Sequence, residues 1–101
     1  MRIYFERSGG FAGMLLTTSV DTDALSEEEA IFFQSNVEES RFFDLPERLG
    51  TPGMGADRFH YHLGVETQER RHTVDFGETA TPEALAPLIE RLTALARSPR
   101  S

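Results

Sequence analysis

Two histidines and an aspartate are the residues whose spacing comes nearest to a metal site. His60 and His62 lie two residues apart in a segment of alternating polar and apolar residues, so both imidazoles project from one face of a strand. Asp75 would be the third ligand, because His72 falls on the opposite face if its strand keeps register. Exposed polar residues on a sheet explain the same pattern. We favour that interpretation, and we predict no bound metal.

The other reactive residues match no catalytic or nucleotide-binding motif. The acids at 27–29 follow Ser26 and are explained by a capping box at a helix start, where the helix dipole favours negative charge. Ser8 and Ser19 lie outside any G-x-S-x-G motif. The glycines of 9–13 lack the spacing of a dinucleotide fingerprint, and a strand rather than a helix follows them. We therefore predict a protein that is not an enzyme and that needs no cofactor.

Net charge narrows the classes of partner. The chain has 10 basic residues against 17 acidic ones, for a net charge of −7, and it has no cysteine. A cationic face is needed to contact phosphates, so a nucleic-acid partner is not expected. Without cysteine there is no disulfide framework and no thiol nucleophile.

Length and hydropathy indicate one domain over 1–101, with a frayed tail at 98–101. No run approaches the roughly 18 apolar residues that cross a bilayer, so no membrane partner is expected. The charged N-terminus does not read as a secretory signal. We expect a cytoplasmic protein.

Two β-hairpins and two helices would position these residues. Alternation predicts strands over 2–7 and 14–20, joined by a turn that begins at Ser8, and a second hairpin over 57–66 and 70–76. In the second hairpin, Phe59, Tyr61, Leu63 and Val65 are predicted to face inward.

One helix is predicted over 27–39, with Ile31 and Phe32 widening its apolar face. A second helix is predicted to start at Thr81 with Pro82 in its first position, to lose one hydrogen bond at Pro87, and to bury a stripe that includes Leu95.

The remaining segments connect these elements. Residues 41–46 would form a short strand or a buried turn, and residues 47–56 a glycine-rich loop. We therefore predict an α+β two-layer sandwich, in which an antiparallel sheet of four or more strands carries two amphipathic helices on one face.

The connection of the first hairpin combines three glycines with one aromatic residue, Phe11. In one interpretation the glycines supply positive φ angles and Phe11 folds back onto the core. In the other, the small residues keep the loop narrow, and Phe11 projects as an anchor into a partner's pocket.

The same segment carries a resemblance. Residues 3–13 (I-x-F-E-R-S-G-G-F-A-G) look like the opening of the emfourin family. The likeness continues through 20–23 (VDTD), 41–46 (RFFDLP), the glycine-rich loop, 57–61 (DRF-x-Y) and 71–74 (RHTV).

The resemblance implies a bacterial, cytoplasmic protein that inhibits thermolysin-like metallopeptidases of the M4 type, with protealysin as the reference target. An inhibitor of this kind would block the active-site cleft with a rigid, glycine-flanked loop. We expect the partner-binding residues to be Ser8, Gly9, Gly10, Phe11, Ala12, Gly13, Asp21 and Asp23. In one version a carboxylate, Asp21 or Asp23, approaches the target's zinc. We favour the other version, in which the loop fills the cleft without contacting the metal.

Two alternatives stay open at this point. The chain could be a non-catalytic interaction module with a partner that is not a protease. Residues 50–56 could lie beside the hairpin tip or at the opposite edge.

Overall fold

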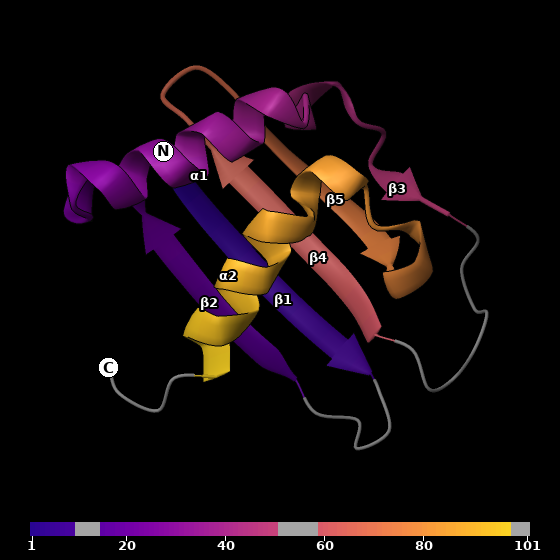
Figure 1. Ribbon diagram of the computed structural model, residues 1–101. Helices are drawn as coiled ribbons and strands as arrows, with labels where there is room; N and C mark the ends of the chain where they lie inside the picture. Colours follow the sequence, from indigo (N-terminus) through magenta and orange to yellow (C-terminus); the bar gives the residue numbers. More distant parts are fainter. Residues whose placement is uncertain (10–14, 51–58, 98–101) are drawn as a thin grey trace.

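The computed structural model describes residues 1–9, 15–50 and 59–97 (Figure 1). Its strands are β1 (Arg2–Gly9), β2 (Leu16–Asp21), β3 (Arg48–Leu49), β4 (Phe59–Glu66) and β5 (Arg71–Gly77), and its helices are α1 (Glu27–Glu39) and α2 (Ala86–Arg97). Short 3-10 turns cover η1 (Thr22–Ala24), η2 (Phe42–Asp44), η3 (Glu78–Ala80) and η4 (Glu83–Leu85).

The described strands form one five-stranded sheet in the order β2-β1-β4-β5-β3. All neighbours are antiparallel except β3, which runs parallel to β5. Both helices cover the same face of the sheet (Figure 1). The predicted α+β fold is therefore confirmed, and β3 is an additional strand inside a segment that we expected to be a loop.

Alternation along the strands separates a helix-covered face from an open face. The side chains that point toward the helices form the core together with apolar residues of α1, η2, η4 and α2. These buried residues are Ile3, Phe5, Val20, Phe33, Val37, Phe42, Tyr61, Leu63, Val65, Val74, Phe76, Leu85, Leu88, Ile89 and Leu92. Apolar burial on this scale is the main force that holds the two layers together.

Helix α1 begins and ends where the sequence predicts. The Ser26 Oγ accepts a hydrogen bond from the Glu29 N–H at 3.3 Å, as a capping box requires. Phe33 and Val37 are buried, but Ile31 is 53% exposed. The prediction that Ile31 widens the buried face is wrong, because two residues of helix rotate it about 200° away from Phe33.

The second helical segment differs from its prediction at its start and in its buried stripe. The 3-10 turn η4 precedes the α-helix, which begins at Ala86 rather than at Thr81. Pro87 therefore lies in the first helical turn, where N–H groups have no intrahelical acceptor, so the expected loss of a hydrogen bond does not occur. Leu95 is 41% exposed, so it does not belong to the buried stripe.

For residues 41–46 the sequence left two alternatives, a short strand or a buried turn, and the structure shows the buried turn. Arg41 adopts a left-handed φ of 55°, and the 3-10 turn that follows buries Phe42.

Among the described residues, no helix has the length and apolar character that a bilayer span requires.

We expect Leu92 and Leu95, both in α2, to differ sharply in their effect on stability. Leu92 is 0% exposed, so Leu92→Ala leaves a cavity in the core and should lower the free energy of unfolding by about 2–5 kcal/mol. Leu95→Ala removes the same atoms from a partly hydrated site and should lower it by less than about 1 kcal/mol. Urea denaturation of both variants measures the difference, and equal losses would contradict this packing.

Candidate functional site

Strand register brings the two glycine-rich segments of the sequence to one end of the sheet. In the antiparallel pairing of β1 with β4, Gly9 lies opposite Phe59. Strand β3 runs parallel to β5 with Leu49 beside Phe76, and His60 lies opposite Gly77. The chain therefore enters residues 10–14 and 51–58, and leaves them, at the same end. We call this end of the sheet, which carries Gly9, Gly50 and Phe59, the loop end.

Of the six predicted loop residues, the structure describes Ser8 and Gly9, whereas Gly10, Phe11, Ala12 and Gly13 lie outside the described residues. The prediction that Ser8 and Gly9 belong to the turn is wrong. They are the last residues of β1 and lie opposite His60 and Phe59, respectively. The strand extends further because β4 offers it a partner that sequence alternation does not reveal. Gly9 has a φ of 89°, a conformation that disfavours any residue with a Cβ.

A stacked pair braces the loop end on its helix-covered side. The Arg7 guanidinium lies 3.9 Å from the centre of the Phe59 ring, which is a cation–π contact between β1 and β4. The Phe59 N–H donates to Glu78 Oε1 at 3.3 Å, which ties the start of β4 to η3. Burial raises the pKa of Tyr61, the next residue on this face, while the nearby Arg7 charge works against that increase.

Close packing anchors the second glycine-rich segment where it leaves β3. Gly50 has a φ of 81°, and a Cβ placed there would lie 2.6 Å from the Ala80 Cβ. The backbone conformation at position 50 and the limited space beside Ala80 therefore both require glycine. Of residues 50–56, whose position the sequence left open, Gly50 lies at the loop end, and 51–56 fall outside the described part of the chain.

Asp21 and Asp23 lie at the opposite end of the first hairpin. Asp21 pairs with Arg2, seven residues before Gly9, which corresponds to about 23 Å along a strand. The Asp21 side chain accepts a hydrogen bond from the Asp23 N–H at 3.0 Å and so caps η1. Both residues are exposed. The structure therefore does not bring them together with Ser8 and Gly9, and their contact with a partner stays a prediction.

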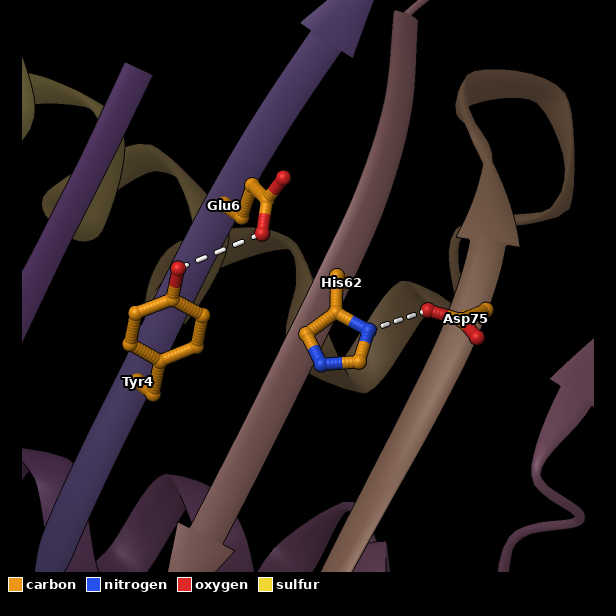
Figure 2. Close-up of polar contacts among 4 residues, drawn as sticks. All are labelled: Tyr4, Glu6, His62 and Asp75. Atoms are coloured by element: carbon orange, nitrogen blue, oxygen red, sulfur yellow. Dashed lines mark hydrogen bonds and ion pairs between the residues drawn. The ribbon is translucent and has the colours of Figure 1, made fainter. Parts of the chain in front are cut away.

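The open face carries a polar cluster that we define as Tyr4, Glu6, His62 and Asp75 (Figure 2). Tyr4 donates its hydroxyl hydrogen to Glu6 Oε1 at 3.2 Å, and His62 Nδ1 lies 2.5 Å from Asp75 Oδ1. A carboxylate only accepts, so His62 Nδ1 is the donor. The sequence pattern predicts the shared face, but it does not predict the cross-strand pairing of His62 with Asp75.

His72 points to the other side of the sheet, as predicted. Its Nε2 donates to the Leu45 carbonyl at 2.6 Å, and its ring packs against Phe42. Over the described ranges, no group of three or more histidine, cysteine or acidic side chains is placed to hold a metal ion. His62 and Asp75 form a hydrogen-bonded pair on the open face of the sheet.

The polar cluster makes the Tyr4 hydroxyl a sensitive probe. Its pKa is raised, first by partial loss of hydration and then by the charge and the hydrogen bond of Glu6. A raised folded-state pKa contributes stability that is complete below the unfolded value near 10 and is lost as the pH rises through the folded value.

We expect Glu6→Gln to lower the pKa of Tyr4, because it removes the negative charge that opposes phenolate formation. The chain has two tyrosines, so a Tyr61→Phe background leaves Tyr4 as the single phenol for an ultraviolet titration. An unchanged midpoint in the Glu6→Gln variant would show that the contact with Glu6 does not act on Tyr4.

Comparison with known proteins supplies the family. The family model described as Emfourin matches residues 5–93, which covers β1 from Phe5 onward, β2 to β5 in full, α1, and α2 up to its eighth residue. No curated protein and no solved structure matches the chain significantly. A match over this share of the sequence establishes membership. The chain therefore belongs to the Emfourin family, a family of metallopeptidase inhibitors.

Proposed function

We propose that this protein inhibits thermolysin-like zinc metallopeptidases of the M4 type, with protealysin as the reference target, by inserting its loop end into the active-site cleft. The protein acts as a folded obstruction and performs no chemistry itself. The observation that carries the proposal is the pairing of Gly9 with Phe59, because it places the attachment points of both glycine-rich segments on neighbouring strands.

Rigid attachment of the glycine-rich loop favours tight inhibition, because ordering a loop on binding costs free energy. Strand β1 pairs with β2 up to Arg7 and with β4 up to Gly9, and the Arg7–Phe59 stack joins β1 to β4 on the side that faces the helices. The segment that begins at Gly10 is therefore attached to a fixed platform. Such a platform also supports resistance to cleavage, since it would hold a cut loop in place for reclosure.

Phe11 is the anchor of the proposed interface. An aromatic side chain on a narrow loop suits a hydrophobic pocket beside the scissile bond, and buried aromatic anchors dominate binding energies in interfaces of this kind. The distance of about 23 Å between Asp21 and the loop end favours a cleft that is filled without a carboxylate from η1 on the zinc. We also propose that the protein meets its target in the cytoplasm.

We expect Phe11→Ala to weaken inhibition by about 2 kcal/mol or more, which is about 30-fold in the inhibition constant. The measurement is residual peptidase activity of a thermolysin-like protease against inhibitor concentration. Ile31→Ala is the matched control, because it removes an exposed apolar side chain from α1.

The thermal midpoint of each variant separates binding from folding. Under the proposal, Phe11→Ala retains the wild-type midpoint and Ile31→Ala inhibits like the wild type. If Phe11→Ala folded normally and inhibited at full strength, the loop would not be the anchor. If Phe11→Ala melted well below the wild type, Phe11 would belong to the core instead.

A further inference from the structure

In the part of the chain that the structure describes, strand β2 forms an unpaired edge of the sheet. Among the described strands it pairs with β1 alone, and its six residues, Leu16–Asp21, contain no proline and one charged residue, at the end. Natural proteins usually protect a sheet edge with charges, proline, a bulge or a very short strand. The other edge follows this rule, because β3 has two residues. The edge at β2 does not.

The hydrogen-bonding pattern shows which backbone groups of β2 face outward. The Thr22 N–H donates to the Met1 carbonyl at 2.9 Å, so alternate residues back along the strand, Val20 and Thr18, direct their backbone groups to β1. The N–H and C=O groups of Thr17 and Ser19 consequently point away from the sheet.

The opposite side of the sheet gives the same result. The Asp75 N–H donates to the Glu47 carbonyl at 2.7 Å, so alternate residues of β5 serve β3 and β4 in turn. Carrying this alternation through the registers of β4 and β1 again assigns Thr17 and Ser19 to the free edge. The outward groups from Thr17 to Asp21 extend over about 13 Å, enough for a partner strand of about five residues.

Charge indicates what kind of strand fits this edge. Residues 21–29 hold five acids and no base, and β2 leads directly into them. Figure 1 shows the start of α1 beside the end of β2. A second copy of the chain would bring another net charge of −7 to this edge, so self-pairing is opposed by repulsion. A segment with a basic side chain near Asp21 would be attracted instead.

We propose that β2 accepts an extended segment of the inhibited protease as an additional strand, with neutral residues opposite Thr17 and Ser19 and a lysine or arginine near Asp21. This inference rests on the proposed function, and it extends the interface beyond the loop. Strand β2 begins at Leu16, directly after the segment 10–14 that is attached at the loop end. A partner held at the loop end therefore lies next to the edge formed by β2. Main-chain hydrogen bonds then supply affinity for the partner strand, and the acids set its orientation.

Amide hydrogen exchange tests the pairing in the unmodified protein. In the free ¹⁵N-labelled chain, the N–H groups of Thr17 and Ser19 should exchange quickly, and those of Thr18 and Val20 slowly. Saturation with a thermolysin-like protease should slow Thr17 and Ser19 by about tenfold or more, because their N–H groups gain acceptors.

A pair of substitutions at Ser19 tests the same hydrogen bond through inhibition. Ser19→Pro removes an N–H that has no partner in the sheet, and proline is tolerated at such edge positions. We expect it to raise the inhibition constant about tenfold. Ser19→Ala keeps the N–H and should stay within about twofold of the wild type. Thr17→Pro replaces Ser19→Pro if circular dichroism shows that the latter is unfolded.

The outcomes separate this inference from the proposed function. If the wild type inhibits the protease while Thr17 and Ser19 exchange as fast as in the free chain, the strand pairing is wrong and the inhibition stands. Folded Ser19→Pro with wild-type inhibition leads to the same conclusion. Protection that grows with the concentration of the free chain, together with a dimer mass, would assign the edge to self-pairing. Absence of inhibition by the wild type would overturn both proposals.

Discussion

The antiparallel pairing of β1 with β4 is the constraint on which the rest of the structure depends. These strands are far apart in the sequence, and their register places Gly9 opposite Phe59 and Arg2 opposite Glu66. A shift of one residue would turn every core side chain of β1 to the open face. The burial of Ile3 and Phe5 therefore fixes the register, and the register fixes which end of the sheet carries both glycine-rich segments.

The molecule divides its tasks between the parts of one sheet. The helix-covered face supplies stability through an apolar core, while the open face carries polar groups such as His62 and Asp75 that satisfy one another. The loop end offers a braced platform, and the edge at β2 offers unpaired backbone groups beside it. Under the proposed function these features are sufficient for inhibition, since obstruction of a cleft requires shape and rigidity rather than reactive groups.

Local signals in the sequence predict most of the elements but not their arrangement. The capping box at Ser26 and the apolar spacing after it give α1 to the residue, because both act within one turn of helix. Strand β3 escapes prediction because two residues carry no periodicity, and β1 extends to Gly9 only because a distant strand pairs with it. For the site, the sequence singles out the loop, but only the pairing of β1 with β4 shows that the second glycine-rich segment is attached beside it.

A structure of the complex between this protein and a thermolysin-like protease is the most direct measurement of the central claim. The account predicts that Gly9 and Phe59 face the active-site cleft and that α1, which packs across the other end of the strands, stays in solvent (Figure 1). A complex in which α1 or the open face covers the cleft, with Gly9 turned to bulk water, would contradict it.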